Sequence, residues 1–294
     1  MKERTMKILL IKKKSFYTIF AEEKKDRKVL THIKKGGLLS ERFLKSHRDN
    51  EASFEKVKSV LKKNRVRFSV SSDLTGTAGG GFDLYISVGG DGTILDASHY
   101  SGGAKILGGN SSPGESVGNF CCCTAANFEE ILKKILDGGI KSHKLPRLRI
   151  LLNGKPLPFG AMNDILFAHK IPAATSRYII KVKEQHEIHK SSGVWVSTAA
   201  GSTGAILSAG GAGMDIKSGS IQFVVREPFS RRDEPYRITG GVVKPGELAF
   251  VSRMVRGAVY IDGQRKCFSV GFGDLITFEF DTRNIDIFLP EWKF

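Results

Sequence analysis

The sequence is poor in the features that mark a secreted or membrane-spanning protein. Among 294 residues there are only 4 cysteines and 2 tryptophans. No apolar run approaches the roughly 20 residues that a membrane-spanning helix needs. The start of the chain is basic, but its apolar core, Met6 and Ile8–Ile11 around Lys7, is too short for the h-region of a signal peptide. We therefore interpret it as a first β-strand and expect a cytoplasmic protein with no membrane partner.

Three of the four cysteines are consecutive, at 121–123, and the fourth is Cys267. Consecutive cysteines lack the spacing of a zinc site or of a secreted disulfide framework. We interpret residues 121–123 as part of a buried apolar strand in a reducing compartment. His and Cys residues show no metal-ligand spacing elsewhere in the sequence, so we expect no metal held by the protein itself.

Positive charge is abundant but unevenly spread. The 46 Lys and Arg residues outnumber the 30 Asp and Glu residues, for a formal net charge of +16 at pH 7. Residues 1–70 carry 21 basic and 8 acidic side chains, so 21 − 8 = +13 of that charge lies there. Such a lobe attracts polyanions; the alternative is a solvated surface that binds nothing in particular. Without an aromatic-basic stacking platform or a recognition helix, we expect no nucleic-acid partner.

The first half of the chain alternates between strand-like and helix-like patterns. Strand, crossover and strand in this order predict a Rossmann-like parallel sheet in an α/β domain over residues 1–143. Residues 13–48 are charged and broken by Gly36-Gly37, so we interpret them as an irregular loop or flap. The predicted strands are 7–12, 65–70, 83–88 and 105–107, and the predicted helices are 52–63, a short one after residue 93, and 127–136.

After about residue 143 the pattern changes to short β-type segments separated by turn signals such as Asn153-Gly154 and Asp262-Gly263. Only one helix is expected, near 203–209. This half predicts an all-β, sandwich-like domain or open barrel over residues 144–294, with a C-terminal tail that can return to the first domain. The predicted strands are 147–152, 163–168, 177–183, 193–198, 220–225, 248–252, 257–261, 267–271, 275–280 and 284–289.

A glycine-rich turn, Gly89-Gly90-Asp91-Gly92-Thr93, directly follows the apolar strand 83–88. At the carboxyl end of a parallel strand such a turn lets backbone N–H groups approach phosphates, and the next helix directs its positive end there. A carboxylate at this place suits a base that takes a proton from an attacking hydroxyl, or a group that orients Mg²⁺ on a nucleotide. The alternative interpretation is a tight turn in which Asp91 caps the helix.

Two further segments carry polar groups suited to a nucleotide. Ser202-Thr203-Gly204 is a small-residue turn whose hydroxyls and N–H groups suit a sugar or a phosphate; tight helix packing is the alternative. Asn163-Asp164 opens an apolar β-segment and offers donors and acceptors for ribose hydroxyls or a base edge. Its alternative is an exposed strand end.

Together these motifs resemble the NAD kinase family, from Lys7 to about Gly263. The family pattern is a GGDGT loop, a Gly-Asn stretch, an Asn-Glu or Asn-Asp pair, and a GSTA-type turn. Other stretches resemble the mitochondrial-type branch more than the common bacterial one. The matching segments are Gly89–Thr93, Gly109-Asn110, Asn163-Asp164 and Gly201–Gly204 for the family, and Gly109–Gly118, Lys190–Gly193 and Arg226-Glu227-Pro228 for the branch.

The resemblance implies a kinase that moves the γ-phosphate of ATP to the 2′-hydroxyl of the adenosine ribose of NAD, with Mg²⁺ carried by ATP and Asp91 as the base. The sequence departs from many members in having Ser192 in place of an aspartate and Ala205 in place of a tyrosine. These departures affect the pose of the dinucleotide but not the base. The residues that the resemblance places at the substrate and nucleotide sites are Gly90, Gly92, Thr93, Asn110, Asn163, Asp164, Lys190, Ser192, Ser202, Thr203, Gly204 and Ser208.

Several alternatives stay open on the sequence alone. A diacylglycerol-type lipid kinase shares the GGDGT loop, and a nucleotide-binding regulator without turnover is a further possibility, although the intact Asp91 argues against it. The phosphate donor is ATP or inorganic polyphosphate, and the acceptor is NAD or NADH. The resemblance also implies a homo-oligomer, either a homodimer or a homotetramer.

Overall fold

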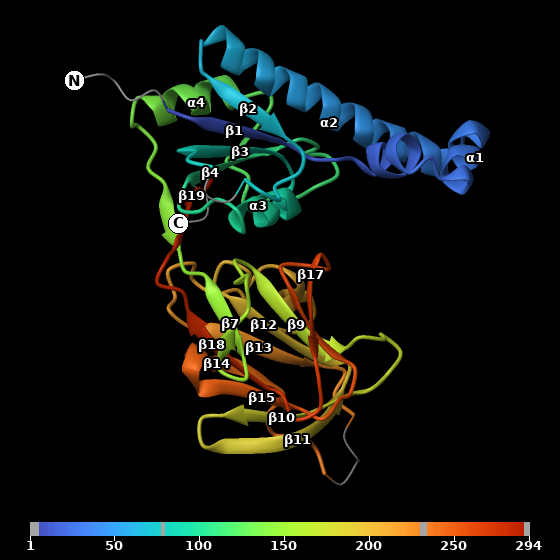
Figure 1. The fold of residues 1–294 in the computed structure, drawn as a ribbon, viewed down its shortest axis with the longest axis vertical. Helices are drawn as coiled ribbons and strands as arrows, with labels where there is room; N and C mark the ends of the chain where they lie inside the picture. Colours follow the sequence, from blue (N-terminus) through green and yellow to red (C-terminus); the bar gives the residue numbers. More distant parts are fainter. Residues whose placement is uncertain (1–5, 78–79, 230–233, 291–294) are drawn as a thin grey trace. The chain divides into compact units, whose positions relative to one another are not determined.

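The computed structural model describes residues 6–77, 80–229 and 234–290, and the chain divides into two compact units (Figure 1). Unit 1 comprises Met1–His143 and Asp286–Phe294, and unit 2 comprises Lys144–Ile285. Each unit has a hydrophobic core of its own.

Unit 1 is built on a seven-stranded sheet with the order β2-β1-β3-β4-β19-β6, and β5 pairs with β4. The pairs from β2 through β19 are parallel. Ile8–Ile11 of β1 and all of β3 are buried, as expected for parallel strands with helices on both faces. The strands are β1 Ile8–Lys12, β2 Phe68–Ser71, β3 Leu84–Gly89, β4 Lys105–Asn110, β5 Cys123–Thr124, β6 His143–Leu145 and β19 Ile285–Phe288.

Helices α2 and α4 cover one face of this sheet and α3 covers the other (Figure 1). Because side chains alternate along a strand, every second residue of β3, from Leu84 to Val88, joins one core with Phe54 and Leu61 of α2 and Phe128 of α4. The helices are α2 Leu38–Lys63, α3 Asp91–Ser98 and α4 Phe128–Leu136.

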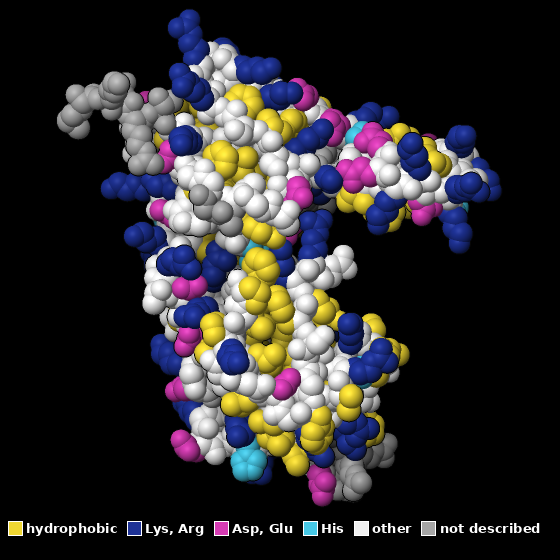
Figure 2. Space-filling model, in the orientation of Figure 1, with side chains coloured by type: hydrophobic (Ala, Val, Ile, Leu, Met, Phe, Trp, Pro, Cys, Tyr) yellow, Lys and Arg dark blue, Asp and Glu magenta, His cyan; other side chains and the backbone are white. Residues whose placement is uncertain are grey.

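The prediction of a loop or flap over residues 13–48 is wrong. This segment contains a π-helix at Thr18–Glu23, helix α1 at Arg27–Lys35 and the first part of α2. Only the break was predicted correctly: Gly36 and Gly37 have φ angles of +73° and +96°, which end α1 before α2 begins. Charged residues dominate this segment, so the helical spacing of its few apolar residues was not recognised. Lys and Arg side chains are prominent over this part of the surface (Figure 2).

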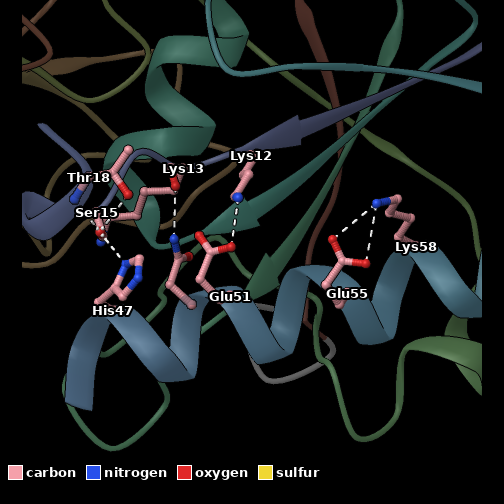
Figure 3. Close-up of polar contacts among 9 residues, drawn as sticks. Lys12, Lys13, Ser15, Thr18, His47, Glu51, Glu55 and Lys58 are labelled. Atoms are coloured by element: carbon pink, nitrogen blue, oxygen red, sulfur yellow. Dashed lines mark hydrogen bonds and ion pairs between the residues drawn. The ribbon is translucent and has the colours of Figure 1, made fainter. Parts of the chain in front are cut away.

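Aromatic contacts and polar ties hold the segment together. The ring of Phe16 stacks on Phe20, 4.1 Å away between centroids, and meets the edge of Phe43 at 5.0 Å. His47 of α2 shares a hydrogen bond of 2.8 Å with the Ser15 hydroxyl (Figure 3). The helical spacing of these aromatic residues could have predicted the helices in spite of the charge.

The lysines after β1 are partly engaged in ion pairs. Lys12 Nζ lies 2.7 Å from Glu51 of α2 (Figure 3), and Lys14 Nζ lies 2.8 Å from Glu23. The Asn50 side chain donates to the Lys13 carbonyl at 2.8 Å. The contacts of Glu51 and Asn50 attach α2 to the carboxyl end of β1, and the Lys14 pair attaches the π-helix, so Lys12 and Lys14 have a structural role.

Unit 2 consists of two six-stranded antiparallel sheets, ordered β11-β10-β15-β18-β7-β8 and β14-β13-β12-β9-β16-β17. One core takes Phe167 and Val196 from the second sheet and Tyr178 and Phe250 from the first, so the two sheets form a sandwich. The strands are β7 Leu148–Leu152, β8 Lys155–Pro156, β9 Asp164–His169, β10 Ser176–Val182, β11 Gln185–Ser191, β12 Gly193–Thr198, β13 Ile221–Arg226, β14 Gly240–Val243, β15 Leu248–Ser252, β16 Gly257–Ile261, β17 Lys266–Val270 and β18 Leu275–Phe280.

The predicted fold class, an α/β domain with a parallel sheet followed by an antiparallel β domain, is confirmed. The predicted helix near 203–209 is α5, Ala205–Ser208. The sequence patterns missed β11, whose residues are mostly polar, and β14, which begins Gly-Gly. Strand 284–289 exists as β19, but it pairs in parallel with β4 of unit 1. No described helix has both the length and the apolarity needed to cross a membrane.

Candidate active site

In unit 1 the glycine-rich turn lies at the carboxyl edge of the parallel sheet. Gly89 ends β3 and Asn110 ends β4, and the two are partners in the parallel register. Gly90 follows as the N-cap of α3, and Asp91 is the first residue of that helix. The structure therefore brings the predicted residues of unit 1 to one edge of the sheet, where open α/β sheets bind their ligands.

The Asp91 carboxylate is held by backbone amides from another loop. It accepts hydrogen bonds from the N–H groups of Asn119 at 2.9 Å and Phe120 at 2.8 Å. Since Gly90 is the N-cap, the interpretation of Asp91 as a helix cap is wrong. Two amide donors fix the orientation of the carboxylate, while the side chain stays half-buried.

The remaining residues of the turn leave room for a ligand. Gly92 is exposed, and a Cβ placed on it would meet no atom within 4 Å. Thr93 packs its hydroxyl against Gly89, where a Cβ would overlap it. The first N–H groups of a helix lack partners within the helix. An anion can therefore approach the amino end of α3 through the open space beside Gly92.

Asn110 is buried and uses its side-chain amide within the protein. Its Nδ2 donates to the Ser116 carbonyl at 2.9 Å, and its Oδ1 accepts from the Ser112 N–H at 3.1 Å. Gly118, with φ +65°, packs against this amide, and a Cβ there would collide with it. In this geometry Asn110 shapes the loop that faces Asp91.

In unit 2, Asn163 and Asp164 lie at the start of β9 and are held by a third polar residue. Asp262, in the turn after β16, accepts from the N–H groups of Met162, Asn163 and Asp164 at 2.9, 2.8 and 3.2 Å. Asn163 Nδ2 in turn donates to Asp164 Oδ2 at 2.9 Å. The backbone of the pair is thus anchored by a carboxylate almost 100 positions along the chain.

The two aspartates titrate near neutral pH. Burial raises the pKa of Asp164 to about 6, against the lowering effect of the Asn163 hydrogen bond. Burial also raises the pKa of Asp262 to about 7, and the neighbouring Asp164 charge adds to that rise. The three backbone N–H groups that donate to Asp262 lower its pKa, but their effect is smaller than that of burial.

The Ser202-Thr203-Gly204 turn lies against this pair. Gly201 has no room for a Cβ, which would overlap the Asn163 carbonyl, and a Cβ on Gly204 would lie 3.0 Å from Asn163 Nδ2. Ser202 is fully buried, and its hydroxyl donates to the Ala199 carbonyl and accepts from the Met214 N–H. Thr203 and, further on, Ser208 are exposed.

The structure does not bring Lys190 and Ser192 to this cluster within unit 2. Both precede the amino end of β12, whereas Thr198, at its carboxyl end, donates its N–H to the Asn163 carbonyl. Six residues of strand span about 17–20 Å. The predicted residues of unit 2 therefore form two groups at opposite ends of β12.

Asp262 is the site residue that the sequence reasoning missed. Asp262-Gly263 was interpreted only as a turn signal, and Asp262 does have the left-handed φ of +49° that such turns use. The three N–H groups that donate to Asp262 come from a segment distant in sequence, so no local sequence pattern predicted these hydrogen bonds. Its position in a turn right after an apolar strand, like that of Asp91, was the available signal.

The cysteine run lies close to Asp91 without forming a metal site. All four cysteines are free, and Cys123 is buried in β5. Burial raises the pKa of Cys121 to about 12, and the Asp91 charge adds to this rise. The thiol is therefore neutral and a weak nucleophile. Among the described residues, no three His, Cys, Asp or Glu side chains gather as a metal site would require.

Comparisons with known proteins identify the family of the chain. Residues 38–140 match the family described as the ATP-NAD kinase N-terminal domain. A probable NADH kinase of Oryza sativa subsp. japonica is 41% identical over 232 residues, which cover 71% of each chain. An NADH kinase of Arabidopsis thaliana is 37% identical over 231 residues, covering 70% of this chain and 73% of the relative.

Solved structures share the fold. An NAD kinase from Archaeoglobus fulgidus in complex with ATP has a TM-score of 0.70 at 22% identity, with 98% of this chain and 96% of that chain covered. Yeast NADH kinase complexed with NADH has a TM-score of 0.67 at 15% identity, with 98% and 84% covered. The relatives that are 37–41% identical are kinases, which are phosphotransferases. The chain belongs to the NAD kinase family.

Proposed function

We propose that this chain transfers the γ-phosphate of ATP to the 2′-hydroxyl of the adenosine ribose of NAD or NADH, giving NADP or NADPH. The observation that carries the proposal is Asp91, whose carboxylate is fixed by two amides at the phosphate-binding edge of the sheet. It occurs in a chain whose plant relatives are named NADH kinases.

Asp91 acts as the general base. A ribose hydroxyl is a weak nucleophile, so its oxygen needs a carboxylate to receive its proton as it attacks the γ-phosphorus and ADP leaves. The N–H groups of Asn119 and Phe120 hold the carboxylate in one orientation. The base therefore loses little freedom when the reaction occurs. Binding and positioning supply the rest of the rate enhancement.

The first turn of α3 is proposed to hold the phosphates of the donor. Gly90, Gly92 and Thr93 form the loop on the phosphate side. The space beside Gly92 is open and the helix dipole favours negative charge there, whereas the Thr93 N–H donates to the Gly90 carbonyl at 2.9 Å. Mg²⁺ enters as part of the MgATP substrate, where it neutralises the charge that develops on the phosphates.

The cluster of unit 2 is proposed to hold the acceptor. The half-buried Asn163 and the buried Asp164 offer an amide and a carboxylate beside the Thr203-Gly204 turn. Such groups can bind ribose hydroxyls and a base edge in a fixed orientation. Ser208 contributes an exposed hydroxyl, while Ser202 and Asn110 support their loops. Lys190 and Ser192 belong to the second group in unit 2.

The test is an assay of the purified chain with NAD or NADH crossed against ATP or polyphosphate, with Mg²⁺. We expect the 2′-phosphorylated dinucleotide from at least one combination. Diacylglycerol as acceptor serves as the control for the lipid-kinase alternative and is expected to give no product. Absence of NADP and NADPH in every combination would refute the proposal.

Two properties of the whole protein are part of the proposal. A cytoplasmic location is supported by the four free cysteines, which suit a reducing compartment, and cell fractionation tests it. A homodimer or homotetramer is supported by the family resemblance, and light scattering coupled to size-exclusion chromatography tests it.

A further inference from the structure

A helical arm of unit 1, residues 16–44, carries apolar side chains that its own fold leaves uncovered. The arm comprises the π-helix, α1 and the start of α2, and it extends beyond the sheet (Figure 1). No residue of α1 is fully buried, and Ala21 is the only buried apolar residue of the arm. The arm therefore presents apolar surface to its surroundings.

The most exposed of these side chains belong to one continuous apolar strip. Leu38 and Leu39 begin α2 and are 76% and 77% exposed, and Phe16 is 54% exposed. Leu39 and Phe43 are four positions apart and share a face of the helix, and the ring of Phe43 in turn meets Phe16 at 5.0 Å between centroids. Phe20 stacks on Phe16 and continues the strip. Scattered exposed apolar residues are ordinary, but a contiguous set marks an interaction surface.

Unpaired positive charge lies next to the strip. Residues 24–35 hold six basic side chains and one acidic one, so the segment carries 6 − 1 = +5. Lys24 Nζ lies 4.7 Å from the centre of the Phe20 ring, and Asp26 is engaged as the N-cap of α1. Within the part of the chain that the structure describes, none of the six pairs with a carboxylate. All six are exposed: Lys24, Lys25, Arg27, Lys28, Lys34 and Lys35.

An anionic lipid surface fits both features of the arm. Interfacial helices place apolar side chains at the boundary of headgroups and acyl chains, and their Lys and Arg side chains meet anionic headgroups. Hydrophobic side chains and Lys or Arg side chains lie next to one another on the arm (Figure 2). A second copy of the chain is disfavoured as the partner, because residues 1–70 carry +13 in each copy and repel each other.

We propose that the arm docks unit 1 on the surface of an anionic lipid bilayer. Leu38, Leu39 and Phe16 enter the boundary region, and the cations of residues 24–35 contact the headgroups. The sequence predicted no membrane partner because it lacks a spanning segment, and surface docking needs none. The residues of the arm are not among those assigned to the kinase reaction, so the proposal does not rest on the proposed function.

Co-sedimentation of the full chain with lipid vesicles tests the apolar strip. We expect binding to vesicles of phosphatidylcholine and phosphatidylserine in a two-to-one ratio, weaker binding to phosphatidylcholine alone, and a decrease as salt is added. The double variant Leu38→Ser/Leu39→Ser should lower the affinity for the mixed vesicles about tenfold or more. Val255→Ser, at a position 82% exposed in unit 2, is the matched control and should bind as the unaltered chain does.

A second pair of variants tests the charge. Lys34→Gln/Lys35→Gln should lower the affinity for the mixed vesicles about fivefold for each lysine. Lys155→Gln/Lys181→Gln removes two exposed lysines of unit 2 and should leave the affinity unchanged. Thermal unfolding checks that all variants fold, which is expected because the altered side chains are exposed.

Two results would overturn the proposal. One is no binding of the unaltered chain to the mixed vesicles, and the other is equal vesicle affinity in Leu38→Ser/Leu39→Ser and the unaltered chain. Polyglutamate in place of the vesicles distinguishes an acidic protein as the partner. A chain that binds polyglutamate but not the mixed vesicles would assign the arm to an acidic protein and refute lipid docking.

Discussion

Backbone amides hold two of the three carboxylates on which this site depends. Asp91 accepts two N–H groups and Asp262 accepts three, so main-chain amides hold each carboxylate in place. Asp164 differs, since it is buried with the amide of its neighbour Asn163 as hydrogen-bond donor. We propose that these environments separate a general base, Asp91, from two positioning carboxyl groups, and single substitutions of Asp91 and Asp164 test this assignment.

Asp91→Asn is expected to abolish turnover while leaving the fold and the affinity for NAD nearly intact. The amide keeps one acceptor for the loop but cannot take a proton from the ribose hydroxyl. Losing the second acceptor costs about 1 kcal/mol of unfolding free energy. Turnover assays, dinucleotide titration and urea unfolding measure these effects. Asp137→Asn, an exposed acidic residue at the end of α4, is the control. Near-normal kcat in Asp91→Asn would rule out its role as base.

Asn163→Ala is expected to raise the KM for NAD more than it lowers kcat. The side chain is proposed to hold the acceptor, which is bound equally in the ground state and the transition state, so its loss weakens binding before it slows chemistry. Initial rates over a range of NAD concentrations measure both constants. An unchanged KM would place the pair outside the site.

Asp164 is expected to make stability depend on pH. Its folded pKa of about 6 exceeds the ordinary 3.8, so the folded state holds a proton that the unfolded chain has released. The unfolding free energy therefore falls as pH rises through this range. From pH 5 to pH 8 this group should contribute a loss of about 1.5 kcal/mol.

Urea unfolding of the unaltered chain and of Asp164→Asn at those two pH values measures this loss. The variant lacks the titrating group and should show a smaller decrease. Equal decreases in both proteins would contradict a raised pKa at this position.

Residues were predictable from the sequence where the chemistry is local. Asp91 stands inside a contiguous loop with a strand before it and a helix after it, so its place at the sheet edge followed from the pattern. Its amide partners, Asn119 and Phe120, did not follow, because a turn almost 30 residues further on supplies them. Asp262 was missed for the same reason.

Elements were predictable where apolar residues keep a strict period. Most strands of unit 2 have such a period, and continuous apolar runs indicated β1 and β3 of unit 1; their bounds agree within a few residues. The three-residue β6 was not predicted. Helix α1 and the first part of α2 were missed because charged residues dominate both; in α2, Phe43 packs against Phe16 at the edge of its ring. Strand β11 was missed because its inward side chains are polar, His189 and Ser191 among them.

The turn between β12 and α5 provides a test at this scale. Gly201→Ala is expected to lower the unfolding free energy by about 1–3 kcal/mol, because the new methyl group collides with the Asn163 backbone. The same shift should raise the KM for NAD. Gly213→Ala, where a Cβ meets nothing within 4 Å, is the matched control. Urea unfolding of both variants measures the difference in unfolding free energy. Equal stability would contradict the prediction and show that the turn accommodates the methyl group.

At the scale of the whole molecule, the two units differ in how the chain builds them. Unit 2 is one continuous segment, whereas unit 1 needs Asp286–Phe294 to complete it. Strand β19 pairs with β4, and its Ile287 and Phe288 are almost fully buried. Its parallel pairing could not be read from the sequence, because an apolar segment of four to six residues suits either type of sheet.

A fragment of residues 144–285 is expected to fold alone and to unfold cooperatively. Residues 1–143 alone should be less stable, because each missing side chain of Ile287 and Phe288 removes about 1.5–3 kcal/mol of burial. Joining residues 284–294 to that fragment through a flexible linker should restore stability. Thermal unfolding followed by circular dichroism compares the three, and a fragment 1–143 as stable as the joined one would show that β19 is dispensable.

The position of β19 near the end of the chain also means that the sheet of unit 1 can be completed only after unit 2 has been synthesised. A ribosome translates all of unit 2 before it reaches β19, so until then Ile106 and Leu107 of β4 lack their partner strand, while β5 pairs only with Gly109 and Asn110. Premature termination anywhere in unit 2 would also remove β19, so it would destabilise unit 1 in addition to deleting part of unit 2.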